Sequence, residues 1–251
     1  MSAALLEYLL RIGDDALVLG HRGSEWIGFA PVLEEELALG NIALDQLDLA
    51  QAALGFAAEL EGQGRDADAL TYLRDDAQFH NALLVEQPNV DFAWAMARQA
   101  LFGAFALPSY RALAASTQPR LAAVGAKAAK EAEYHARHAR TWVLRLGDGT
   151  DESRARMQAA VDELFPYLGE LLESDAVTRE LAAAGIAPDP SALADEALAT
   201  IAALLREATL AQPAPGAFRP RGGRAGRHSE HLGRMLAEMQ VLARAHPGAR
   251  W

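Results

Sequence analysis

The sequence contains no cysteine and few β-branched residues, and each shortage excludes a class of protein. Without cysteine among its 251 residues, the chain cannot form a disulfide scaffold, a thiolate zinc site, an iron–sulfur cluster or a cysteine nucleophile. Valine, isoleucine and threonine together number 21, against 55 alanines and 37 leucines. Sheets favour β-branched residues, whereas alanine and leucine are favourable in helices. We therefore predict an all-α chain that forms one domain over residues 1–251.

Long apolar runs and a basic surface are also missing. The most apolar stretch, residues 92–107, is interrupted by Arg98 and is too short to span a bilayer. The N-terminus mixes apolar residues with charged ones, unlike a signal peptide. With a net charge of −11, most of the molecule should repel nucleic acid. These features predict a cytoplasmic protein that binds neither nucleic acid nor a membrane.

Glycine and proline residues divide the chain into long helical segments. Helices are predicted at about 3–22, 32–61, 66–85, 91–116, 119–146, 151–173, 176–184, 191–211 and 229–245. Long helices joined by short connections favour an antiparallel bundle, which we place at about residues 32–146, with the other helices packed outside it.

The predicted helix at 91–116 differs from its neighbours because apolar and aromatic residues lie all round it. Between Phe92 and Lys130 the sequence has no aspartate or glutamate. Such a helix is buried on most sides. It is expected either at the centre of the domain or under another subunit.

The acidic and histidine residues of the chain can be compared with the ligand set of a di-iron helical bundle. In such a bundle two helices each supply one carboxylate, and two each supply Glu-x-x-His. The four helices predicted over residues 32–146 offer Glu36 or Asp45 in the first, Asp75 and Gln78 in the second, none in the third, and Glu131, Tyr134 and His135 in the fourth. Gln78 and Tyr134 occupy the positions of the two histidines. The ligand set is therefore degenerate, and we expect this chain to bind no metal.

Two other interpretations of these residues stay open. The polar stripes can face solvent or a protein interface. Alternatively, the chain can bind iron through Glu36 or Asp45, Asp75, Glu131 and His135, with His138 as an additional ligand.

Lys127 and Lys130 are the only lysines in the sequence, and both lie on the helix predicted at 119–146. Lys127 precedes Glu131 by one helical turn, so its ammonium group could stand where a metal ion would otherwise lie. This hypothesis predicts that Lys127 forms a buried ion pair with Glu131 or with an inward-facing acid such as Asp45. The alternative is that both lysines are solvated surface groups.

The C-terminal region is rich in arginine. Residues 222–227 (GGRAGR) share only their glycine and arginine content with a phosphate-binding loop, and no strand precedes them. We interpret residues 213–228 as a flexible linker that leads to the last helix at 229–245. The sequence assigns no role to the arginine-rich segment 219–227, to His138, or to His228 and His231.

Several strings of the sequence resemble one protein family. The chain is similar to the PaaC-type subunits of bacterial ring-1,2-phenylacetyl-CoA epoxidases at residues 10–15 (LRIGDD), 37–45 (LALGNIALD), 84–89 (LVEQPN), 126–135 (AKAAKEAEYH), 145–150 (RLGDGT) and 229–240 (SEHLGRMLAEMQ). The similarity extends from about residue 5 to Trp251.

This resemblance implies a ferritin-like helical subunit of a multicomponent oxygenase. In such a complex a homologous catalytic subunit holds the di-iron centre, and a reductase with FAD and a 2Fe-2S cluster supplies electrons from NADPH. The PaaC-type subunit is structural and pairs with the catalytic one. The resemblance thus implies the catalytic subunit and other epoxidase subunits as partners. The alternatives are a subunit that itself binds iron and a helical interaction protein outside this pathway.

Overall fold

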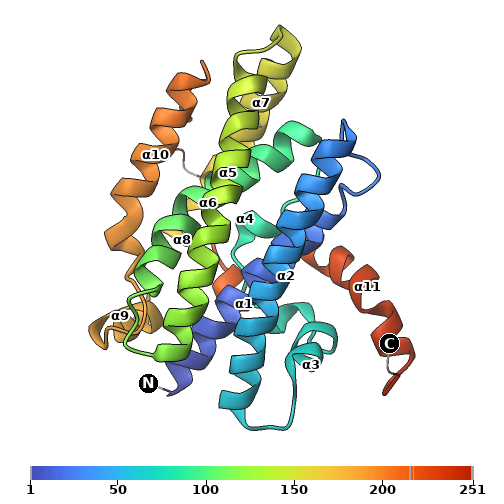
Figure 1. Ribbon diagram of the computed structural model, residues 1–251, viewed down its shortest axis with the longest axis vertical. Coiled ribbons are helices and arrows are strands. Elements are labelled where there is room, and N and C mark those ends of the chain that lie inside the picture. Colours follow the sequence, from blue (N-terminus) through green and yellow to red (C-terminus); the bar gives the residue numbers. More distant parts are fainter. Residues whose placement is uncertain (1, 215, 217, 250–251) are drawn as a thin grey trace.

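Two helical hairpins form the centre of the molecule (Figure 1). The computed structural model describes residues 2–214, 216 and 218–249, and these residues contain helices and no strand. The first hairpin pairs α1 (Ser2–Ser24) with α2 (Leu33–Glu61), and the second pairs α5 (Phe92–Leu113) with α6 (Pro119–Gly147). The prediction of an all-α bundle is confirmed. The helix that precedes residue 32 also belongs to the bundle, because α1 packs along α2.

Shorter elements surround the four long helices. They are α3 (Ala67–Tyr72), η1 (Asp76–Gln78), α4 (Leu83–Glu86), α7 (Asp151–Leu164), η2 (Phe165–Tyr167), α8 (Leu168–Leu171), α9 (Ala176–Ala183), η3 (Pro190–Leu193), α10 (Ala194–Glu207), η4 (Gly223–Ala225) and α11 (Glu230–Ala245). Side chains at the starting positions explain several of these boundaries. Asp66 and Thr150, for example, accept backbone N–H bonds at the starts of α3 and α7.

The predicted helix at 66–85 is wrong, because the chain leaves the helical path after Tyr72. Two buried carboxylates of α1 accept hydrogen bonds from backbone N–H groups that would otherwise bond to carbonyl oxygens within a helix. Asp14 Oδ2 accepts the N–H of His80 at 2.8 Å, and Asp15 Oδ1 accepts the N–H of Ala82 at 2.7 Å. Hydrogen bonds to charged acceptors are stronger than bonds between neutral groups, so they offset the lost helical bonds.

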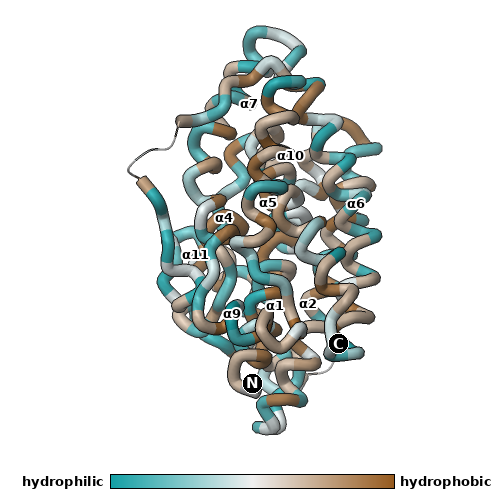
Figure 2. The backbone as a smooth tube through the Cα atoms, turned by 90° about the vertical axis from the view of Figure 1, so that its left-hand side faces the viewer, coloured by the Kyte–Doolittle hydropathy of each residue, from teal (hydrophilic) through white to brown (hydrophobic). Residues whose placement is uncertain are grey.

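The aromatic helix α5 lies in the middle of the molecule. In Figure 2, α4 and α6 lie on either side of it, and it also packs against α7 and α10. Most of its residues are buried, among them Met96, Leu101 and Phe102. Of the two expectations for this helix, the central position is the one found. Its apolar surface is covered largely by helices of the same chain.

The last helix, α11, extends from the bundle toward the C-terminus (Figure 1). Ser229 caps it, and Leu232, Met235 and Leu236 are buried. On α11, Gln240 donates its side-chain amide to the carbonyl oxygens of Thr71 and Arg74, at 2.9 and 3.0 Å. These contacts hold α11 against the irregular segment that follows α3.

Candidate functional site: a degenerate ligand set and a buried charge network

A polar seam runs between α2 and α6. His135 Nε2 lies 3.0 Å from Asp45 Oδ2, and its Nδ1 lies 3.4 Å from the side-chain amide of Gln46. One helical turn away, His138 Nε2 lies 2.7 Å from Glu35 Oε2. Burial lowers the pKa of His135, although the Asp45 carboxylate opposes that shift. The seam therefore consists of two histidine–carboxylate pairs that bridge the two helices.

Lys127 lies at the exposed end of this seam. Its ammonium group pairs with Asp48 and lies 3.6 Å from Glu131 Oε1, while 58% of its side chain is exposed. Burial raises the pKa of Glu131, and the Lys127 charge opposes the shift. The predicted ion pair with Glu131 is present, but the prediction that it is buried is wrong. Lys127 stands at the surface together with Asp48, the acid with which it pairs.

The remaining predicted ligands do not meet at one place. Asp75 and Gln78 are exposed on the segment after α3, where their side chains cap η1 and Asp75 pairs with Arg244 at 3.0 Å. Glu36 lies nine residues before Asp45, which places the two on opposite sides of α2. Tyr134 is partly exposed, and its ring contacts that of His138. The assignment of Asp75 and Gln78 to an inward-facing site is therefore corrected.

The residues present do not fit a di-iron centre. Helix α5 offers no carboxylate, and Glu131 is followed by Tyr134 where histidine is needed. The Nε2 atoms of both seam histidines are already bound to carboxylates of α2. Within residues 2–214, 216 and 218–249, no group of three or more histidine and acidic side chains is arranged to hold a metal ion.

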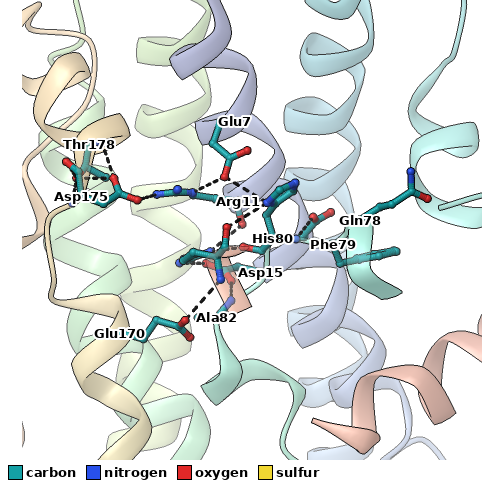
Figure 3. Close-up of polar contacts among 12 residues, drawn as sticks. Glu7, Arg11, Asp15, Gln78, Phe79, His80, Ala82, Glu170, Asp175 and Thr178 are labelled. Atoms are coloured by element: carbon teal, nitrogen blue, oxygen red, sulfur yellow. Dashed lines mark hydrogen bonds and ion pairs between the residues drawn. The ribbon is translucent and has the colours of Figure 1, made fainter. Parts of the chain in front are cut away.

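A buried charge network, which was not predicted from the sequence, is centred on Asp14 and Asp15 of α1. Figure 3 shows its contacts around Asp15, His80 and Ala82. Asp14 pairs with Arg74, and Asp15 pairs with Arg224 Nη2 at 2.7 Å. Burial raises the pKa of Asp15, and the Arg224 guanidinium together with the N–H of Ala82 opposes the shift. Next to these pairs, Glu170 accepts the N–H groups of Leu83 and Gly222, each at 2.8 Å.

The C-terminal residues 222–228 complete this network, so this part of the predicted flexible linker is packed against the body of the protein. Arg224 Nη1 donates to the carbonyl of His80 at 2.9 Å. Close approach requires glycine, because a Cβ on Gly226, where φ is 70°, would collide with the carbonyl oxygen of Ala77. The sequence contains a feature that could have predicted this packing. Buried aspartates need cationic partners, and the glycine–arginine run of this acidic chain can supply them.

A second buried pair joins His228 to Glu86. His228 Nδ1 lies 2.7 Å from Glu86 Oε2, and its Nε2 lies 3.0 Å from the carbonyl oxygen of Phe79. A carboxylate and a carbonyl oxygen both accept hydrogen bonds, so this arrangement favours the imidazolium form, in which both ring nitrogens carry protons. Burial lowers the pKa of His228, but its interactions with Glu86 and Phe79 outweigh burial and raise the pKa above 6.5.

This raised pKa predicts a loss of stability toward alkaline pH. A group whose folded pKa exceeds its unfolded value stabilises the protein fully below the unfolded pKa, and the stabilisation is lost as pH rises through the folded pKa. We expect the melting temperature to fall as the pH rises above about 6.5, the unfolded pKa of histidine, and to fall less in His228→Gln. An NMR titration that places the pKa of His228 at or below the unfolded value would contradict the assignment.

A pocket of about 210 Å³ adjoins the charge network. Aromatic side chains line it, namely Tyr8, Phe102, Phe105 and Tyr110. At its rim, Arg11 pairs with Asp175 at 2.7 Å. Burial raises the pKa of the Tyr8 and Tyr110 hydroxyls, so both stay protonated at neutral pH.

Comparison with known proteins identifies the family. The sequence profile described as "Phenylacetic acid catabolic protein" matches residues 1–251. The chain belongs to this family. Its relatives include a subunit of the 1,2-phenylacetyl-CoA epoxidase of Escherichia coli (strain K12), which is 49% identical over 247 residues, or 98% of this chain and 99% of that protein. The resemblance stated from the sequence is confirmed.

A solved structure supports the fold assignment. "Protein 19 with aldehyde deformylating oxidase activity from Synechococcus" superposes with a TM-score of 0.51, covering 94% of this chain and 97% of that one at 21% identity. The fold of the chain is ferritin-like, as predicted.

Among the described residues, no helix combines the length and the apolar character that a membrane span requires.

Proposed function

We propose that this chain is the structural, non-catalytic subunit of a phenylacetyl-CoA epoxidase and that it pairs with a catalytic di-iron subunit. The support for a place in that complex is its 49% identity to an epoxidase subunit over nearly the whole of both proteins. The observation that carries the non-catalytic role is the donor set of the bundle. A di-iron centre needs carboxylates from all four helices, and α5 has none.

Other subunits would supply the chemistry in this proposal. The catalytic subunit would hold the di-iron centre, and a reductase with FAD and a 2Fe-2S cluster would deliver electrons from NADPH. The acidic and histidine residues of this chain that most resemble metal ligands form ion pairs instead, and these pairs hold the bundle together. Asp45–His135 and Glu35–His138 link α2 to α6, and Asp14–Arg74 fixes the crossover between the two hairpins.

Metal analysis tests this proposal. After anaerobic incubation with Fe(II) and removal of free metal, the isolated chain is expected to retain well under one iron per chain, because α5 offers no carboxylate and the seam histidines are already paired with Asp45 and Glu35. The copurified catalytic subunit serves as the positive control for reconstitution. Two irons per chain in the isolated protein, with an oxo-bridge absorption band, would refute the structural role.

A further inference from the structure

Helix α2 is apolar on two opposite sides. One side is buried in the bundle through residues such as Leu39, Ile42 and Leu49. The other side faces outward and, with the loop before the helix, carries large apolar side chains that are 38–80% exposed. These residues, here named the α2 patch, are Ile27, Phe29, Val32, Leu33, Leu37, Leu44 and Leu47.

The α2 patch is a continuous strip. Leu33, Leu37 and Leu44 follow one another at spacings of four and seven residues, so they lie along one line of the helix. The loop folds against the same side, since a Cβ built on Gly40 would lie 3.7 Å from Ile27 Cδ1. In Figure 1, α2 runs beside α1 and α6, both of which contact it. A contiguous exposed apolar strip with polar residues at its edges is typical of an interaction surface.

The apolar area of the α2 patch matches one side of a stable interface. Burying a large apolar side chain contributes ~1.5–3 kcal/mol at ~25 cal/mol per Å², which corresponds to roughly 100 Å² per side chain. Seven such side chains, a little over half exposed on average, offer about 400 Å². A standard interface buries ~800 Å² per partner, of which ~57% is non-polar. The patch therefore supplies nearly all the apolar area that one partner contributes.

The charge around the α2 patch selects the kind of partner. Residues 25–48 contain six acidic residues and no lysine or arginine. Arg22 and Lys127 pair with Glu25 and Asp48, and His138 and His135 lie against Glu35 and Asp45. Even if both histidines are charged, the carboxylates of Glu34 and Glu36 leave the surroundings of the patch negative. A second copy of this chain would place like charges opposite one another, which is unfavourable. A different chain with basic side chains beside an apolar strip is complementary to this surface.

We infer that the α2 patch is the surface on which the partner subunit docks, through a helix whose apolar strip is flanked by arginine or lysine. The identity of the occupant as the catalytic subunit rests on the proposed function, whereas the location of the surface rests on the exposed residues alone. Helix α5, although richer in apolar residues, offers no such surface, because it is covered by its own chain.

A pair of matched double variants tests the inference. Leu37→Glu with Leu44→Glu places two charges in the α2 patch, and Val241→Glu with Leu242→Glu places two at similarly exposed positions of α11. Both should fold as the unmodified chain does, as judged by circular dichroism and melting. We expect the α2 variant to raise the Kd for the purified catalytic subunit by about 100-fold, and the α11 variant to leave it within about threefold.

The outcomes separate this inference from the proposed function. If the unmodified chain and the α2 variant bind the catalytic subunit equally well, the inference is wrong and the proposed function stands. If the unmodified chain does not bind that subunit at all, the proposed function fails and this occupant with it. A self-association that the α2 variant abolishes would show that a second copy is the occupant and would overturn the partner named here. Protection of the amides of residues 33–47 from hydrogen exchange in the complex would support the inference.

Discussion

Replacement of Asp14 by asparagine is expected to lower the free energy of unfolding by about 3 kcal/mol. The side chains of Asp14 and Arg74 are only 0% and 3% exposed, so the substitution leaves a buried guanidinium without its counter-ion. The expected loss of free energy is near the lower end of the range for breaking a buried ion pair, because Arg74 still donates hydrogen bonds to the carbonyl oxygens of Leu70 and Gln78. In a chain of this size the melting temperature should fall by roughly 6–12 °C.

Lys127→Met is the matched control for Asp14→Asn. It also removes one partner of an ion pair, but the pair is largely exposed and therefore weak. We expect it to change the free energy of unfolding by at most about 1 kcal/mol. Equal losses in the two variants, measured by chemical denaturation, would mean that burial does not set the cost of removing a charge in this protein.

Glu86→Gln is expected to loosen the C-terminal region and to destabilise the whole chain by about 3–5 kcal/mol. The fully buried Glu86 carboxylate accepts from Asn81 Nδ2 at 2.9 Å, from His228 Nδ1 at 2.7 Å and from the N–H of Ser229 at 2.6 Å. A glutamine turns one of these accepting oxygens into a donor and removes the charge that holds the imidazolium of His228. Hydrogen exchange should accelerate in residues 222–245, and the pKa of His228 should fall.

The control for Glu86→Gln is Glu230→Gln, on α11 itself. Glu230 pairs with Arg234 at 3.3 Å, and both side chains are more than two-thirds exposed. This variant should leave exchange in α11 close to that of the unmodified protein, because an exposed pair of this kind contributes little. If Glu86→Gln behaves in the same way, the carboxylate of Glu86 does not anchor the C-terminal segment.

Local sequence patterns located most of the long helices and showed that α5 carries no carboxylate. The boundaries of α2, α6 and α11 lie within about two residues of those predicted, since proline, glycine and capping residues act on the backbone next to them. The absence of acids between Phe92 and Lys130 is likewise a property of the sequence alone. The segment at 66–85 could not be predicted in this way. Its backbone donors bond to Asp14 and Asp15, more than sixty residues earlier in the chain.

The sequence by itself determined that the protein is helical, that no acid lies between Phe92 and Lys130, and that the chain belongs to the phenylacetic acid catabolic protein family. These properties depend on composition, local spacing and long matched strings. Only the tertiary structure decided which charges are buried and which apolar faces are covered. Lys127 is exposed, Arg224 is mostly buried, and α5 rather than α2 is enclosed. Burial depends on how distant helices pack and not on the periodicity of any one of them.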